Sequence, residues 1–189
     1  MKRILVIAAL VPALVSLSSC TGDATATPAP VSHAQKIERG RYLVTVGGCN
    51  DCHTPLKMGA NGPEPDMSRM LSGHPASVVM PKPKKSAGGL WAWQGSSTNT
   101  AFAGPWGVSY ARNLTPDQVS GIGIWDESMF ILTLRTGRHM GVSRRLLPPM
   151  PWFNYAKMSD GDLKSVYAYL RSIPPVRNEV PDAVIAGGM

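Results

Sequence analysis

The residues best suited to chemistry are Cys49, Cys52 and His53, which lie within five consecutive positions. Two cysteines separated by two residues and followed at once by a histidine form the attachment pattern of a c-type haem. In that chemistry each thiol adds across one vinyl group of the porphyrin, and the adjacent imidazole is held against the iron. The pattern predicts one covalently attached haem, with Cys49 and Cys52 as attachment points and His53 as an iron ligand.

The same two cysteines taken alone would permit other interpretations. A Cys-x-x-Cys pair also occurs in redox-active dithiols and as half of a zinc site. The histidine directly after Cys52 favours haem over both. A dithiol oxidoreductase would also require a strand-helix-strand frame, and the sequence around the motif does not indicate one.

The second axial ligand of the iron has several candidates, because the chain contains 10 methionines. Met150 lies in the loop 148–152, which holds three prolines and can present a thioether at a small entropic cost on folding. Met150 is therefore the preferred sixth ligand, and Met140, Met80 and His139 are the alternatives. Most other methionines are expected to fill the core.

This ligand pair predicts what the site does. Iron held by His53 and Met150 is six-coordinate in both oxidation states, which leaves no open position for a substrate. A thioether ligand and burial both raise the reduction potential. The sequence therefore predicts a carrier of single electrons rather than an enzyme. The competing enzyme-class hypothesis is a haem peroxidase or gas-binding protein whose sixth position is open or easily displaced.

Residues 1–20 have the pattern of an export signal, because Lys2 and Arg3 precede an apolar run that ends at Cys20. The run 17–20 resembles the lipobox of bacterial lipoproteins, which implies a lipid on Cys20. An ordinary secretory signal or an uncleaved anchor is the alternative, although the run falls short of the about 20 residues that span a bilayer. We expect a lipid-anchored protein on the periplasmic side of a bacterial membrane, where c-type haem is attached.

The rest of the chain divides by composition. Residues 21–32 contain Thr, Ala and Pro with Asp23 as their one charged residue, which predicts a flexible tether. With 43% hydrophobic residues, the chain can form one domain with a proper core, expected over residues 33–176. Residues 177–189 are expected to form an irregular C-terminal tail.

Three helices are expected to position the site. Ser32 and Gln35 form a capping box before a helix that leads into the haem motif. Asp126 caps a second helix that ends at Gly137, and Ser159 caps a third. The third helix has a capping box completed by Asp162. Two prolines, Pro174 and Pro175, end it. Its apolar stripe consists of Leu163, Val166, Tyr167, Leu170 and Ile173.

Residues 54–112 show no sustained period and are rich in glycine and proline. We expect a long irregular excursion that wraps over the haem and is pinned by Trp91, Trp93 and Trp106, because a large apolar cofactor offers it a surface to pack on. Residues 121–125 are expected to form a short extended piece.

Several separated segments resemble the class I c-type cytochromes, and more closely the monohaem units and cytochrome subunits that serve periplasmic dehydrogenases in bacteria. The resemblance covers about residues 34–176 and is carried by 39–44, 48–55, 113–117, 121–125, 135–137, 148–152 and 158–171. It implies an all-α, cytochrome c-like fold, with three or more core helices around a covalently bound haem. The long irregular insertion 58–112 is the chief departure.

The resemblance also implies roles for individual residues. It assigns Met150 as the distal ligand and pairs Gly40 with Tyr167 where the first and last helices cross. It suggests that Trp125, with Asn113, binds a haem propionate. It further suggests that the backbone carbonyl of Pro63 accepts a hydrogen bond from the ring of His53.

Charge suggests the kind of partner. The formal net charge is +7, and removal of Lys2 and Arg3 with the signal leaves +5. Between residues 128 and 159 there is no acid, but there are five basic residues, Arg135, Arg138, Arg144, Arg145 and Lys157. This arc predicts docking to an acidic face on a redox partner, a dehydrogenase or an oxidase. Simple solvation, or pairing of one arginine with a propionate, is the alternative. Nucleic acid is not an expected partner outside the cytoplasm.

Overall fold

The computed structural model describes residues 30–82 and 92–186. The predicted signal with Cys20, nearly all of the tether, and Trp91 lie outside the described residues. Within the described ranges, no helix is both long enough and apolar enough to cross a bilayer.

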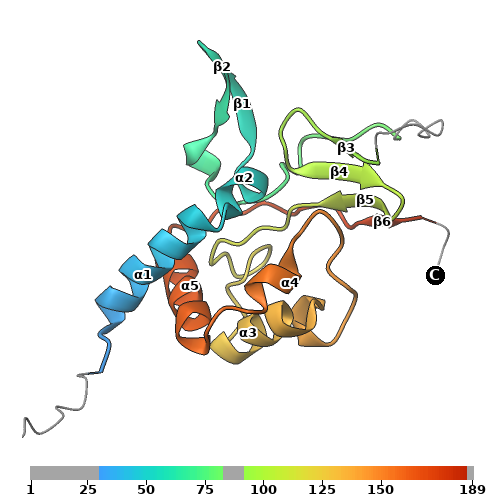
Figure 1. The fold of residues 1–189 in the computed structure, drawn as a ribbon. Coiled ribbons are helices and arrows are strands. Elements are labelled where there is room, and N and C mark those ends of the chain that lie inside the picture. The colour runs from blue at the N-terminus through green and yellow to red at the C-terminus, as the bar shows by residue number, and fades with distance from the viewer. Residues whose placement is uncertain (1–29, 83–91, 187–189) are drawn as a thin grey trace, which may run out of the picture. The chain divides into compact units, whose positions relative to one another are not determined.

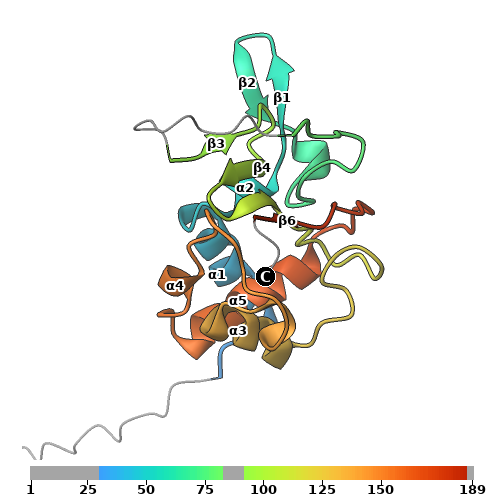
Figure 2. The same cartoon turned by 90° about the vertical axis from the view of Figure 1, so that its right-hand side faces the viewer.

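The helices appear in the following order. They are α1 (His33–Val46), α2 (Cys49–His53), α3 (Glu127–Thr136), α4 (Trp152–Tyr155) and α5 (Asp160–Ser172), with short 3-10 turns η1 (Met67–Arg69) and η2 (His139–Gly141). The strands are β1 (Leu56–Gly59), β2 (Gly62–Pro65), β3 (Gln94–Gly95), β4 (Ala101–Gly104), β5 (Gly107–Tyr110) and β6 (Val184–Ile185). Strands β1 and β2 form a hairpin, and an antiparallel sheet has the order β3-β4-β5-β6. This sheet lies on one side of α3 and α4 in both views (Figures 1 and 2).

The three helices predicted from caps are confirmed. Ser32 and Gln35 make both halves of the capping box at α1, and the Asp126 carboxylate accepts from the Met129 amide at the start of α3. Gly137 ends α3 in the left-handed region, with φ 63°. Ser159 begins α5 by accepting from the amide of Asp162 at 3.1 Å, but the Asp162 carboxylate accepts from Arg39 and does not complete the predicted capping box. Short-range capping bonds thus define the ends of the main helices.

Helices α1 and α5 pack directly on each other (Figure 1), and Gly40 lies at their contact. A Cβ at Gly40 would overlap the backbone oxygen of Ser165 and approach the Cβ of Tyr169 to 2.7 Å. The predicted close approach is therefore confirmed, but its partner is not Tyr167. Tyr167 instead donates its hydroxyl to the carbonyl of Trp125 at 2.7 Å, on the side of α5 that faces α3.

The prediction of an all-α domain with an irregular insertion is wrong in part. The segment after the haem motif contains the hairpin β1–β2 and strands β3 to β5, and β6 joins the same sheet from the C-terminal end. Residues 121–125 form turns and bends and not an extended piece. Strands of two to four residues in a glycine- and proline-rich stretch carry no readable alternation, which is why the sequence did not reveal them.

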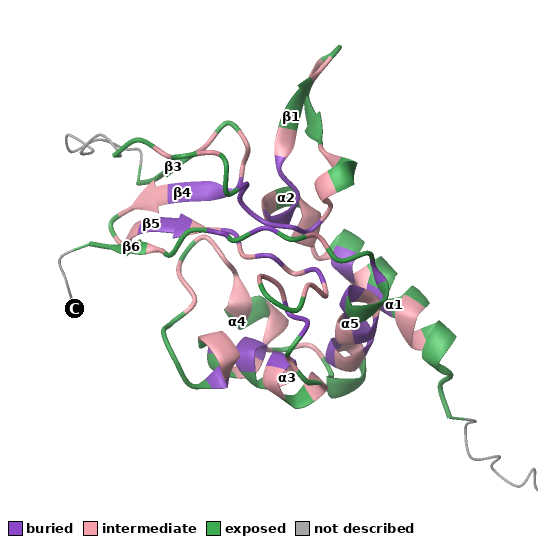
Figure 3. Ribbon diagram, turned by 180° about the vertical axis from the view of Figure 1, so that it is seen from behind, coloured by how far each residue is buried: buried purple, intermediate pink, exposed green. Residues whose placement is uncertain are grey.

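The predicted C-terminal tail is irregular over residues 177–183, but it is packed against the domain and ends in strand β6. Asn178 and Val180 are buried, and residues Val184 and Ile185 pair with β5. We call residues 176–185 the C-terminal strap. Buried positions concentrate along the α1–α5 contact, on β4 and β5, and in the loops between them (Figure 3). The strap therefore belongs to the packed domain.

Candidate functional site

A cavity of about 750 Å³ opens beside the cysteine-histidine motif. Its walls come from α2, α3, strands β4 and β5, the loop before α4, and the C-terminal strap. This volume lies within the roughly 300–1,000 Å³ typical of pockets for small molecules and cofactors. Segments from the whole length of the described chain therefore converge on one site.

Both cysteines line this cavity from the short helix α2. Gly48 precedes the helix with φ 67° and ψ 24°, a left-handed conformation that glycine adopts without steric cost. Because Cys49 and Cys52 are three positions apart, one helical turn brings both thiols to the same face. Both cysteines are free, and both line the same cavity.

The imidazole of His53 is buried, with 8% of the residue exposed. Its Nδ1 lies 2.7 Å from the backbone oxygen of Arg112 and donates to it, which leaves Nε2 free of a proton. Burial lowers the pKa of His53, while the Arg112 hydrogen bond partly opposes that shift. The result is a neutral imidazole held in the tautomer that a metal ligand requires.

The carbonyl that orients His53 differs from the expected one. Pro63, the predicted partner, lies on β2 of the hairpin, whereas Arg112 follows β5 at the end of the insertion. This contact joins residues 59 positions apart. Such a separation carries no local sequence signal, so Arg112 was missed.

The two thiols do not resemble those of a dithiol oxidoreductase. Burial raises the pKa of Cys49 to about 11, and burial together with Asp51 raises the pKa of Cys52. Reactive redox cysteines have lowered pKa values instead. The described residues also contain no group of three or more His, Cys, Asp or Glu side chains arranged to hold a metal ion, as a zinc site of that composition would need.

Three candidates for the second axial position line the cavity, namely Met150, Met140 and His139. Met80 is not among the lining residues. The Met150 loop is fixed from β5, because the buried hydroxyl of Ser109 donates to the carbonyl of Pro148 at 2.6 Å. The structure therefore reduces the alternatives to Met150 and two neighbours in η2.

Trp125 and Asn113 also line the cavity but differ in their hydrogen bonding. The Asn113 amide donates both hydrogens within the protein, to Ser120 Oγ at 3.1 Å and to Val176 O at 2.7 Å. Its oxygen accepts from Thr115. Asn113 thus organises its own loop and has no amide hydrogen left for a propionate. The indole of Trp125 packs edge-on against His139, with ring centroids 5.3 Å apart.

One part of the cavity wall is positively charged. Arg112 and Arg144 supply the positive charge. His139 also lines the cavity, but burial and then the charges of Arg144 and Arg112 lower its pKa and so favour the neutral imidazole. Asp51, Glu179 and Asp182 also line the cavity, and Asp182, whose side chain is 96% exposed, lies 3.6 Å from Arg112. This cationic wall suits a ligand that bears carboxylates, and its residues become adjacent only in the fold.

The inserted segment lines the cavity with residues of its sheet and not with its described tryptophans. Phe102 and residues 109–113 line the cavity, whereas Trp93 and Trp106 do not. Trp93 packs edge-on against Phe102, and Trp106 donates its indole hydrogen to Ser109 Oγ at 3.3 Å. Trp93 and Trp106 therefore contact sheet residues that line the cavity, without lining it themselves.

The residues present fit a covalently attached haem. Paired thiols, a neutral histidine with its Nε2 free, a thioether and a cationic wall all face one cavity of suitable volume. In the part of the chain that the structure describes, no other thiol competes for these roles.

The chain is similar to cytochrome c subunits of dehydrogenases. It is 30% identical over 150 residues to the gluconate 2-dehydrogenase cytochrome c subunit of Pantoea cypripedii, covering 79% of this chain and 26% of that protein. It is 30% identical over 151 residues to the fructose dehydrogenase cytochrome subunit of Gluconobacter japonicus, covering 79% of this chain and 24% of that protein.

A third relative is a much longer protein. It is a nicotinate dehydrogenase subunit from Pseudomonas putida, 32% identical over 148 residues, which is 78% of this chain and 9% of that protein. The chain thus spans a tenth to a quarter of the length of these relatives. No protein-family model matches the chain.

Proposed function

We propose that this chain is an electron-transfer cytochrome c with one haem c, bonded through Cys49 and Cys52 and ligated by His53 and Met150. The observation that carries the proposal is the convergence of these four side chains on a single cavity. The bound group would supply an iron centre that gains and loses one electron. Similarity to three cytochrome subunits of fructose, gluconate and alcohol dehydrogenases supports the same class.

The protein's own residues would bind and shield this group. Cys49 and Cys52 provide two covalent tethers, and the hydrogen bond from His53 to Arg112 keeps the imidazole neutral and correctly turned. Buried Phe102, Ile122 and Phe130 exclude water from the cavity wall. A dry wall and a thioether ligand both favour the reduced state. An axial pair supplied by the protein leaves no position for a substrate, which supports a carrier and not an enzyme.

The partner that we propose is a dehydrogenase, with this chain acting as its electron-accepting subunit or carrier. The support is the identity of the relatives, each of which is part of a dehydrogenase. Arg138, Arg144 and Arg145 flank η2, Arg144 lines the cavity, and no described acid lies within ion-pair distance of the three. Arg135 is different, because it pairs with Asp160. The η2 loop therefore suits an acidic docking face.

We also propose that the mature protein is held on the periplasmic side of a bacterial membrane by a lipid on Cys20. The support is the sequence pattern of residues 1–20 and the requirement that c-type haem be attached outside the cytoplasm.

Mass spectrometry of the protein from a host that matures c-type cytochromes tests both attachments together. We expect one haem mass retained after denaturation, and a lipid mass on a chain that begins at Cys20. Substitution of both Cys49 and Cys52 by serine should abolish the haem mass and leave the lipid mass unchanged. A colourless wild-type protein would contradict the haem proposal, and a haem protein without lipid would contradict only the anchor.

A further inference from the structure

Residues 109–112, at the point where β5 leaves the inserted sheet, contact both sides of the cavity. All four residues line it. His53 comes from α2 and Met150 from the loop before α4, so the two proposed ligands have no common element to fix their separation. The segment 109–112 makes one hydrogen bond to His53 and one to Pro148, two positions before Met150.

The contact on the histidine side is the backbone oxygen of Arg112. It accepts from Nδ1 of His53 at 2.7 Å and thereby fixes the rotation of the ring. The backbone around Arg112 is itself fixed, because the Ala111 amide donates to Thr100 O at 2.8 Å and the Ala111 oxygen accepts from His74 N at 2.9 Å. The acceptor therefore has a defined position before any ligand binds.

The side chain of Arg112 ties this position to the C-terminal strap. Its Nη1 donates to Val180 O at 3.1 Å and to Pro181 O at 3.0 Å. Burial lowers the pKa of Arg112, and the two carbonyls compensate the buried donor. The guanidinium of Arg112 thus connects the residue that orients His53 to the C-terminal strap, which forms part of the cavity wall.

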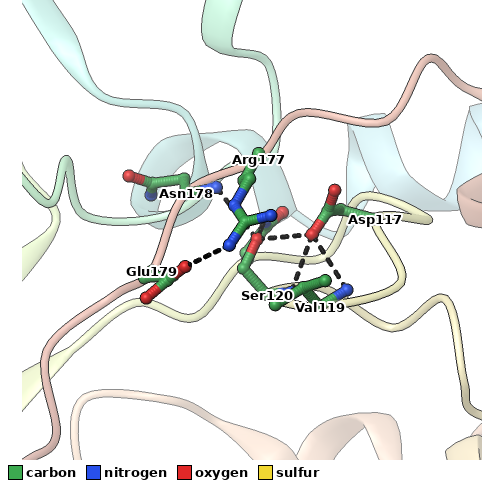
Figure 4. Close-up of polar contacts among 7 residues, drawn as sticks. Asp117, Val119, Ser120, Arg177, Asn178 and Glu179 are labelled. Atoms are coloured by element: carbon green, nitrogen blue, oxygen red, sulfur yellow. Dashed lines mark hydrogen bonds and ion pairs between the residues drawn. The ribbon is translucent and has the colours of Figure 1, made fainter.

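The C-terminal strap is also fixed by hydrogen bonds at Asn178, close to the two carbonyls that Arg112 contacts. The amide of Asn178 donates to Ser120 Oγ at 2.9 Å, and Ser120 in turn donates to Asp117 at 2.7 Å (Figure 4). The buried side chain of Asn178 donates to Ser72 O at 2.7 Å and to His74 O at 2.8 Å. Beside these bonds, the ion pair of Arg177 with Glu179 is exposed, with each side chain 65% accessible.

The contact on the methionine side is the hydroxyl of Ser109. It donates to Pro148 O at 2.6 Å and accepts from Trp106 Nε1 at 3.3 Å. Pro148 lies two positions before Met150, and the prolines of this loop have little freedom in φ. A single hydrogen bond at Pro148 can therefore set the distance of the Met150 segment from the sheet.

We infer that residues 109–112 position both axial ligands, with Ser109 and Arg112 as positioning residues on opposite sides of the cavity. This inference rests on the proposed function for the identity of the distal ligand. Its histidine half rests only on bonds within the chain. A well-placed acceptor at Nδ1 makes the imidazole a stronger donor to iron, which favours the oxidised state.

The histidine half is tested by Arg112→Lys, which keeps the positive charge but loses the planar fork that bridges two carbonyls. We expect hydrogen exchange at His53 Nδ1, followed by NMR on protein with labelled histidine, to become about tenfold faster. The reduction potential should rise, because the imidazole becomes a weaker donor. Arg177→Lys is the matched control, since it makes the same change on the strap without touching Arg112, and it should match wild type.

The methionine half is tested by Ser109→Ala with Ser109→Thr as the rescue. Loss of the hydroxyl should let added imidazole displace the Met150 thioether from oxidised iron with an apparent affinity about fivefold higher. Threonine keeps the donor and suits a strand, so it should restore the wild-type affinity. Equal affinity in all three proteins would overturn the role of Ser109.

The outcomes separate this inference from the proposed function. A haem protein in which Arg112→Lys leaves Nδ1 exchange unchanged and Ser109→Ala leaves imidazole affinity unchanged overturns the positioning role alone. A wild-type protein without haem overturns the proposed function, and the exchange comparison still tests Arg112 because the His53–Arg112 bond needs no haem.

Discussion

At the scale of single residues, the site combines two kinds of information. The spacing of Cys49, Cys52 and His53 is local, so the sequence alone was sufficient to place them on one cavity wall. The acceptor for His53 is the backbone oxygen of Arg112, and the cationic wall consists of Arg112 and Arg144, which are far from the motif in the chain. Their roles depend on the fold, and residue type alone does not disclose them.

The sixth ligand can be assigned by one substitution. In Met150→Ala, we expect the oxidised haem to become high-spin and the reduced haem to bind carbon monoxide stoichiometrically, whereas wild type should not bind it. The potential should also fall, because the thioether that favours reduced iron is lost. Visible absorption spectra and carbon monoxide titration measure both effects.

Met140→Ala is the matched control, because Met140 lines the same cavity. It should retain the wild-type spectrum. A high-spin Met140→Ala beside a normal Met150→Ala would transfer the assignment to Met140, and carbon monoxide binding by wild type would favour a gas-binding or peroxidase function.

His74 predicts a pH dependence of stability. It is fully buried, with Nδ1 2.8 Å from Thr100 Oγ1 and Nε2 2.9 Å from Val78 O. Burial lowers its pKa, and the charge of Arg69 adds to that effect. Below the unfolded-state pKa of about 6.5, the unfolded chain binds a proton that the native protein does not. The free energy of unfolding should therefore fall as the pH drops through this range.

In His74→Gln we expect this pH dependence to weaken by up to about 1.4 kcal/mol per pH unit. Urea unfolding followed by circular dichroism at pH 7 and at about pH 5.5 measures the difference. His33→Gln, at the exposed first residue of α1, is the control and should retain the wild-type slope. An identical slope in His74→Gln would mean that His74 does not carry the effect.

At the scale of elements, the helices and the strands differ in how far sequence predicts them. Helices α1, α3 and α5 are bounded by Ser, Asp and Gly caps that act over three or four residues, so their ends were predictable. Strand β6 pairs Ile185 with Gly107, and β3 has two residues, so these pairings depend on tertiary contacts. The same distinction explains Gly40, whose need for close packing was evident while the identity of its neighbour was not.

The crossing of α1 and α5 predicts the effect of one added methyl group. Gly40→Ala should lower the free energy of unfolding by about 2–3 kcal/mol, because the new Cβ meets the backbone of Ser165, which cannot move without shifting α5. Urea denaturation of the haem protein measures this loss.

Gly161→Ala provides the opposite control within α5. A Cβ at Gly161 meets only the Ser159 hydroxyl, at 3.8 Å, so alanine should stabilise the helix by up to about 1 kcal/mol. Equal effects of the two substitutions would contradict close packing at the crossing.

At the scale of the whole molecule, positively charged arginine side chains lie near the cavity. Arg138 and Arg145 lie near η2 in the chain and Arg144 lines the cavity, while α1 residues 33–46 contribute nothing to the cavity wall. A positive surface beside the cavity should raise the local concentration of anionic redox partners, and salt should weaken this effect.

Arg145→Glu tests this asymmetry. Oxidation of the reduced protein by ferricyanide, an anionic reagent, should slow by roughly threefold or more at low ionic strength and approach wild type at high salt. Lys36→Glu makes the same charge change on α1 and should have a smaller effect. Stopped-flow absorbance measures the rates, and equal slowing by both variants would indicate that only net charge matters.

The C-terminal strap has a consequence for biogenesis. The sulfurs proposed to receive the haem lie at Cys49 and Cys52, whereas residues 179–183 complete the wall and would cross the membrane after them during export. A chain delivered N-terminus first therefore offers its thiols to a maturation enzyme while the wall is still incomplete. Final closure by β6 would then retain the inserted group, so the order of synthesis matches the order in which loading and sealing must occur.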